Sequence, residues 1–163
     1  MEVIALGPQS IKIKGKNATF VVNPSGKVDS EVVILTQRAD SYSQYGDNLV
    51  IDGPGDYEVS GVSIKGEATN GKVSYTFLEE NQGFLLLASN AAAKDKEAED
   101  LAATILMMDD KADNVLSTLA SQLVIVCGSD EFLPSEKETL KKADKINLKK
   151  IEDYKGFVVH LSK

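Results

Sequence analysis

The sequence predicts an α+β fold in which two mixed β-sheets are flanked by helices. Apolar runs with the two-residue period of strands fill the chain as far as Ala88, and Gly, Pro and Asn separate them. From Ala91 the composition shifts toward Ala, Lys and Glu, which favour helices. Apolar runs then alternate with helical segments, so hairpins cannot join the later strands and a mixed sheet is expected.

The first half of the chain has the pattern of strands joined by tight turns. Residues 10–14 alternate polar with apolar side chains, which indicates one buried face, and Gly15-Lys16-Asn17 turns the chain back. Residues 31–35 form an apolar, β-branched run that suits a strand covered on both faces. Gly53-Pro54-Gly55 must turn or bulge the backbone. The predicted strands are 3–6, 10–14, 18–22, 31–35, 49–52, 57–64, 72–79 and 83–88.

The second half mixes helices with strands. Residues 105–108 fit either an extension of the preceding helix or a buried strand, and we favour the strand. Ser135 and Glu138 match a capping box, so a helix is expected from there to about Ala143. The other predicted helices are 91–101 and 111–122, and the other predicted strands are 123–127, 146–148 and 157–161.

The length and composition suit one cytoplasmic domain spanning 1–163. A domain of 163 residues buries roughly two thirds of its unfolded surface, so it needs no covalent staple. The single cysteine excludes an internal disulfide. The first residues lack the basic segment of a signal peptide, and no stretch approaches the ~20 apolar residues of a membrane span.

The net charge of −7 argues against nucleic acid or an anionic membrane as a partner, because phosphate binding needs a basic surface. Lysines gather between 137 and 150, but Glu and Asp are interleaved with them. We interpret that segment as a solvated face.

Metal and nucleophile chemistry have few candidate residues. A catalytic zinc needs about three ligands of the His, Cys, Asp or Glu type and an open position. The chain has one histidine, His160, expected on a strand, and one cysteine, Cys127, expected in the core. Asp109 and Asp110 lack the glycine-containing loop of a calcium site and are expected to start a helix. No metal or other cofactor is therefore predicted, and no serine has a well-placed base.

Several segments resemble the metallo-β-lactamase superfamily. The most specific is 51–62, Ile-Asp-Gly-Pro-Gly-Asp-Tyr-Glu-Val-Ser-Gly-Val, which is similar to a Gly-Pro-Gly-Glu-Tyr-Glu-Val-x-Gly segment of metal-dependent hydrolases and lactonase-like proteins. Residues 6–10 resemble the opening Leu-Gly-His-Ser, and Asn23-Pro24 stands where the family has Asp-Pro. The resemblance implies a shortened αββα sandwich.

The resemblance also implies that the metal ligands have been replaced. Residues 32–42 resemble the strand and loop that carry H-x-H-x-D-H in that superfamily. Ser89-Asn90 stands where Gly-Asp is expected, and Cys127-Gly128-Ser129 follows the strand that precedes a later histidine. In the loop, the histidine positions hold Gln37, Ala39 and Tyr42, and the aspartate position holds Ser41.

The resulting hypothesis is a non-catalytic, metal-free protein of this fold that acts as a ligand-binding or assembly module. The resemblance brings a set of polar residues to the former metal end, where they either bind a small polar ligand or only fill the vacated site with hydrogen bonds. Asp56 and Glu58 point the same way on a strand, a spacing that acid–base pairs use, although the resemblance gives their turn a shaping role. The candidate site residues are Gln37, Arg38, Asp40, Tyr42, Asp56, Glu58 and Asn90.

Two alternatives stay open at this point. One is a lactonase-like or phosphodiesterase-like hydrolase with an unconventional site, which requires Asp40, Asp56, Glu58 and Asn90 to converge around one cavity. The other is a homo-oligomer that pairs through exposed strand edges.

Overall fold

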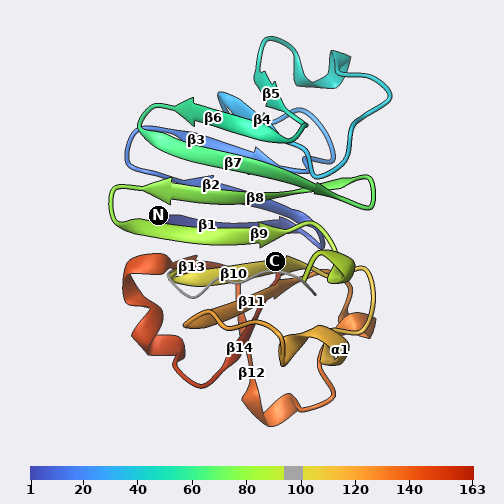
Figure 1. Cartoon of the computed structure of the whole chain (residues 1–163), viewed down its shortest axis with the longest axis vertical. Coiled ribbons are helices and arrows are strands. Elements are labelled where there is room, and N and C mark those ends of the chain that lie inside the picture. The colour runs from blue at the N-terminus through green and yellow to red at the C-terminus, as the bar shows by residue number, and fades with distance from the viewer. Residues whose placement is uncertain (94–100) are drawn as a thin grey trace.

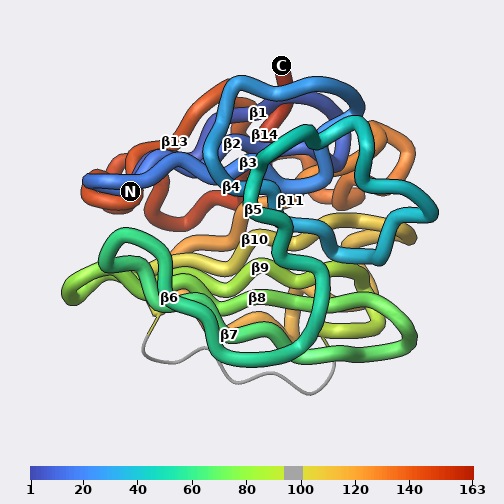
Figure 2. The backbone as a smooth tube through the Cα atoms, turned by 90° about the horizontal axis from the view of Figure 1, so that it is seen from above, coloured from blue at the N-terminus to red at the C-terminus, as the bar shows by residue number. Residues whose placement is uncertain are grey.

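The computed structural model describes residues 1–93 and 101–163, in which two β-sheets face each other as separate layers (Figures 1 and 2). Within these residues one sheet has six strands in the order β13-β1-β2-β3-β4-β5. Its strands are β1 (Glu2–Gly7), β2 (Ser10–Lys14), β3 (Thr19–Val22), β4 (Val32–Ile34), β5 (Leu49–Ile51) and β13 (Lys145–Asn147).

The second sheet has eight strands among the described residues, in the order β12-β14-β11-β10-β9-β8-β7-β6. Its β6 to β9 part is antiparallel, whereas β9, β10, β11, β14 and β12 are parallel, so the predicted mixed sheet is confirmed. Its strands are β6 (Gly55–Val59), β7 (Val62–Thr69), β8 (Lys72–Glu79), β9 (Gln82–Leu87), β10 (Ala103–Met107), β11 (Leu123–Cys127), β12 (Leu140–Ala143) and β14 (Val158–Leu161).

Two-residue turns join the antiparallel strands and set their register. The β6–β7 turn is Ser60-Gly61 and the β7–β8 turn is Asn70-Gly71. All four residues have positive φ, between 49° and 83°, as the turns that match the twist of a hairpin require. The predicted strand 57–64 is therefore wrong, because this turn divides it between β6 and β7.

The chain crosses between the sheets at Gly53-Pro54-Gly55, where the sequence predicts a turn or bulge. β5 is the edge of one sheet and β6, which follows at once, is the edge of the other. The crossing lies so close to β7 that a Cβ on Gly66 would stand 2.8 Å from the carbonyl oxygen of Gly53. Tyr57 donates its hydroxyl to the same carbonyl at 2.8 Å, which fixes the turn.

Aromatic rings fill the centre of the space between the sheets. Phe77 on β8 stacks on Phe84 of β9, with ring centroids 4.7 Å apart. Phe20 of β3 contacts the Phe77 ring edge-on, with centroids 5.9 Å apart. All three side chains are fully buried. Because Phe20 comes from one sheet and Phe77 from the other, this contact joins the two layers.

The outer layers are thinner than predicted. The predicted helix 111–122 shortens to α1 (Asp113–Leu116), and the predicted helix 91–101 has only a 3₁₀ turn, Asn90–Ala93, at its start. The rest of that second prediction, 94–100, lies outside the described residues. In the part of the chain that the structure describes, no helix is long and apolar enough to cross a membrane.

The predicted helix from Ser135 to Ala143 is wrong. A 3₁₀ turn, Lys137–Thr139, is followed by β12, which pairs with β14 in parallel. The Ser135 hydroxyl does not cap a helix; it donates to the Asp113 carboxylate at 2.9 Å. Strand pairing with β14 therefore overrides the local helical preference of this segment.

The aromatic contact predicts a large loss of stability for Phe77→Ala. Removing a fully buried ring leaves a cavity between the sheets and should cost about 3–5 kcal/mol of unfolding free energy. Urea unfolding followed by circular dichroism measures it. The control is Leu78→Ala, the next residue on β8. Leu78 is 46% exposed, so its removal should change stability by about 0.5 kcal/mol or less. Equal losses in the two variants would contradict this account of the core.

Candidate functional site

The candidate site lies where strands of both sheets end, on the side where the arrowheads of β3 and β9 point in Figure 1. Two contacts bring this end together. Gln9, in the β1–β2 turn, donates its amide to the carbonyl of Met108 after β10, at 2.7 Å. The Val73 amide of β8 donates to the carbonyl of Thr36 after β4, at 2.7 Å. Loops from the two sheets therefore meet here.

A cavity of about 400 Å³ opens between these loops. Most of the residues that line it are polar and uncharged, and most of them come from the segments that follow β1, β3 and β4. The lining residues are Gly7, Pro8, Gln9, Ser10, Asn23, Ser25, Thr36, Gln37, Lys72 and Ala88.

Asn23 and Thr36 form the floor of the cavity. The Thr36 amide donates to Asn23 Oδ1 at 3.0 Å, and Asn23 Nδ2 donates to Thr36 Oγ1 at 3.0 Å and to the Gln9 carbonyl at 3.3 Å. Asn23 has a φ of 47°, a left-handed conformation that asparagine adopts more readily than most residues. Its amide both donates and accepts, which a carboxylate at this position cannot do.

Asn90 ties the end of β9 to the loop after β10. Its Nδ2 donates to the carbonyls of Asp110 and Lys111, each at 3.0 Å, and its Oδ1 accepts from the Asp109 amide at 3.2 Å. Its own backbone amide donates to Asp109 Oδ1 at 2.9 Å. The side chain is buried. The predicted site residue Asn90 therefore joins two loops by hydrogen bonds and does not line the cavity.

The Asp109 carboxylate also holds Lys72, the first residue of β8. Lys72 Nζ lies 3.0 Å from Asp109 Oδ2, and the side chains are 30% and 36% exposed. Sequence reasoning missed Lys72 because a lysine at the start of a strand carries no local signal. Only the register of the β7–β8 hairpin places it at the cavity.

The other predicted loop residues fall into two groups. Gln37 lines the cavity and also a neighbouring one of about 340 Å³, in which it is joined by Arg38 and Asp52. Arg38 Nε lies 3.7 Å from Asp52 Oδ2, and Tyr42 donates its hydroxyl to the same carboxylate, which raises the pKa of Tyr42. Asp52, which the sequence did not single out, is thus the centre of this second group.

Three predicted carboxylates lie apart from the cavity lining. Asp40 is exposed in the loop after β4, and Asp56 and Glu58 are exposed on β6, the edge strand of the eight-stranded sheet. Asn90 is hydrogen-bonded to the loop after β10. The four residues that the hydrolase alternative needs, which are these three carboxylates and Asn90, therefore do not gather around the 400 Å³ cavity.

His160 and Cys127 occupy opposite faces of the eight-stranded sheet. Cys127 points between the sheets, and burial raises the pKa of its thiol to about 12. His160 pairs in register with Val126, which packs on the outer face. Its ring nitrogens find no hydrogen-bond partner among the described residues, and Nδ1 lies 3.8 Å from Asp130 Oδ1. Burial lowers the pKa of His160, and the backbone of Gly128 and the Asp130 carboxylate oppose that shift.

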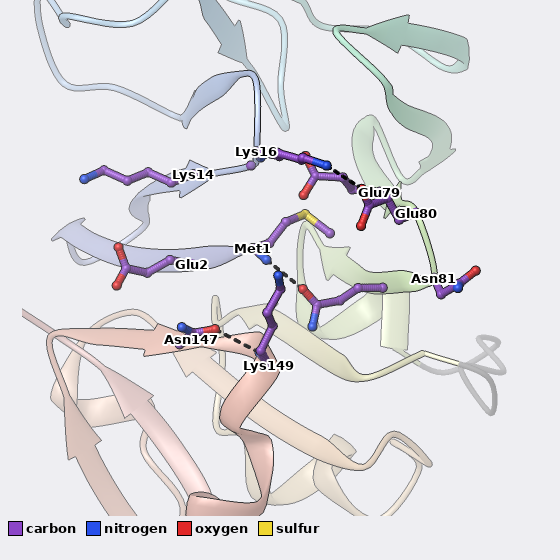
Figure 3. A pocket seen from close by; sticks show the side chains of 11 residues that line it. Met1, Glu2, Lys14, Lys16, Glu79, Glu80, Asn81, Asn147 and Lys149 are labelled. Carbon is purple, nitrogen blue, oxygen red and sulfur yellow. Dashed lines mark hydrogen bonds and ion pairs between the residues drawn. The ribbon is translucent and has the colours of Figure 1, made fainter.

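A second, larger cavity of about 640 Å³ lies at the other end of the strands (Figure 3). Some of the polar groups that line it are bonded to one another. Lys16 Nζ bonds to Glu80 Oε1 at 3.0 Å, and the Lys16 amide donates to Glu79 Oε1 at 2.7 Å. The Met1 nitrogen donates to Gln82 Oε1 at 2.6 Å. The first cavity is taken as the candidate site because loops that follow strands of both sheets meet there.

No protein-family model and no curated protein matches this sequence. Solved structures do match it. A metallo-β-lactamase superfamily protein of Thermotoga maritima aligns over 100% of both chains with a TM-score of 0.70 and 17% identity. The metallo-β-lactamase fold protein YhfI from Bacillus subtilis aligns over 99% of this chain and 96% of its own, with a TM-score of 0.61 and 9% identity. This chain has the metallo-β-lactamase fold.

A third structure of that fold contains zinc. Zn²⁺-bound PqqB from Methylobacterium extorquens aligns over 99% of this chain and 98% of its own, with a TM-score of 0.54 and 9% identity. The residues of the present cavity do not fit such an ion. Their side chains offer amides, hydroxyls and one ammonium, which repels a cation. Among the described residues, no group of three or more His, Cys, Asp and Glu could hold a metal.

The floor of the cavity predicts that Asn23→Asp destabilises the protein. The aspartate keeps the shape and the acceptor but loses both Nδ2 donor bonds, which should cost about 1–3 kcal/mol. Thermal unfolding measures the change. Asn17→Asp, in the exposed β2–β3 turn, is the matched control and should leave the midpoint nearly unchanged. Equal midpoints for the two variants would mean that the floor does not depend on the amide.

The buried imidazole predicts a pH-dependent stability. Because the folded-state pKa of His160 is lowered, its stabilising contribution is complete above the unfolded value of about 6.5 and is lost as the pH falls below it. Urea unfolding at a series of pH values should give a steeper loss for the wild type than for His160→Gln. The slope attributable to this residue cannot exceed about 1.4 kcal/mol per pH unit. Identical slopes in the two proteins would contradict this role.

Proposed function

We propose that this chain is a metal-free, non-catalytic protein of the metallo-β-lactamase fold that binds a small polar ligand in the 400 Å³ cavity. The observation that carries the proposal is the composition of the cavity wall. Among the described residues that line it there is no imidazole, thiol or carboxylate. Polar groups able to hydrogen-bond a ligand remain, and these are the groups that orient ligands in protein cavities.

The same wall supports binding over hydrolysis. Hydrolysis needs an activated nucleophile or a general base within hydrogen-bond reach of the substrate. The Ser10 hydroxyl is buried and donates to the Val22 carbonyl at 3.2 Å. The Lys72 ammonium is paired with Asp109 and contributes a positive charge to the site.

The edge strands of the eight-stranded sheet support ligand binding over assembly. Edges that pair with other chains are long and uncharged. In this chain β6 carries exposed Asp56 and Glu58, and β12 carries exposed Lys141 and Lys142. Charges of this kind on short edge strands disfavour edge-to-edge pairing.

The proposal predicts that protein purified without chelators carries no stoichiometric zinc, iron or manganese in elemental analysis. With each metal added, it should hydrolyse phosphodiester, lactone and thioester substrates no faster than the blank. The control for residual contaminant activity is the Gln37→Leu variant, which should give the same background rate. One firmly bound transition metal per chain would contradict the proposal. So would a hydrolysis rate above the blank that Gln37→Leu abolishes.

A further inference from the structure

We propose that the ligand of the cavity is a small carboxylate whose remaining part carries hydroxyl groups. This inference rests on the proposed binding function and names the chemical class that the site accepts. Lys72 is the one charged side chain among the described residues that line the cavity. A wall with one cation and no carboxylate is complementary to a ligand with one negative charge.

Lys72 has hydrogen-bonding capacity to spare. An ammonium carries three N–H donors, and one of them serves Asp109. The other two have no partner among the described residues, and the side chain is only 30% exposed. Partial burial reduces screening by solvent, so an anion bound here gains more than it would at a surface lysine.

The uncharged part of the wall selects hydroxyl groups on the ligand. The Gln37 amide and the Ser25 hydroxyl make no hydrogen bond among the described residues, so both can donate and accept. Gln9 uses its NH₂ group on the Met108 carbonyl, which leaves its own carbonyl oxygen as an acceptor. Hydroxyl groups satisfy such a mixture because each one donates and accepts.

Carboxylate fits this site better than phosphate. A phosphate group carries nearly two charges and three acceptor oxygens, and protein sites for it gather several cations or backbone amides. Here a single ammonium faces the cavity, and Asp109 lies 3.0 Å from it. A doubly charged ligand would face this carboxylate with only one compensating cation.

The negative charge of Asp109 should therefore weaken the binding of an anionic ligand. Its carboxylate is fixed by the Asn90 amide at 2.9 Å and cannot swing away without losing that bond. Asp109→Asn removes the competing charge and retains an acceptor for Asn90. This variant should bind the anion more tightly, an effect that a merely structural role for Asp109 does not produce.

Calorimetric titration with three related compounds at matched ionic strength tests the inference. Gluconate carries the carboxylate, glucose 6-phosphate the phosphate, and glucose neither. We expect gluconate to bind at least about tenfold more tightly than glucose, and more tightly than glucose 6-phosphate. Lys72→Gln should abolish the preference for gluconate over glucose, Lys72→Arg should restore most of it, and Asp109→Asn should tighten gluconate binding about threefold.

Lys14→Gln is the matched control, because it removes the same charge at the opposite end of the strands and should leave gluconate binding unchanged. Glucose bound as tightly as gluconate would overturn the carboxylate assignment while leaving a binding function intact. Tighter binding of glucose 6-phosphate, retained preference in a folded Lys72→Gln variant, or no gluconate binding at about 10 mM would also overturn it. Failure of the proposed function itself is a separate outcome, because it appears as bound metal or hydrolysis.

Discussion

Buried polar groups must be hydrogen-bonded, and this constraint governs the end of the sandwich where both sheets terminate. The loops after β3, β4, β9 and β10 bring backbone amides and carbonyls together there. Asn23 and Asn90 satisfy several of them, each by donating from Nδ2 and accepting at Oδ1. The loops around the cavity are therefore joined by two asparagine side chains together with the Gln9–Met108 and Val73–Thr36 hydrogen bonds.

The amide is the side chain that suits this place in the absence of a cation. A carboxylate can only accept, and two or more carboxylates at one site repel each other unless a positive charge lies between them. At position 90 the resemblance places an aspartate in active relatives, whereas this chain has an asparagine that donates twice. The Asn90 amide therefore joins the loops through its own hydrogen bonds.

The strands of this fold were largely predictable, and the helices were not. Two-residue periodicity and Gly53-Pro54-Gly55 are local signals, and β2, β3 and the crossing from β5 to β6 follow them. Residues 140–143 have helical propensity but pair with β14, a partner distant in sequence. The site divides in the same way. Gln37 follows a predicted strand and lines the cavity, whereas Lys72 and Asp109 meet only through hairpin register and strand order.

The cavity combines a rigid floor with one adaptable charge. Asn23 and Asn90 each make several short hydrogen bonds in partly buried surroundings, so displacing either side chain leaves polar groups unpaired. The Lys72–Asp109 pair is about one third exposed, and pairs of this kind contribute about 0–1 kcal/mol. Redirecting the ammonium from Asp109 to a ligand therefore costs little, whereas the pair holds Lys72 beside the cavity when no ligand is bound. This difference in cost allows a ligand to enter without disturbing the loops that shape its site.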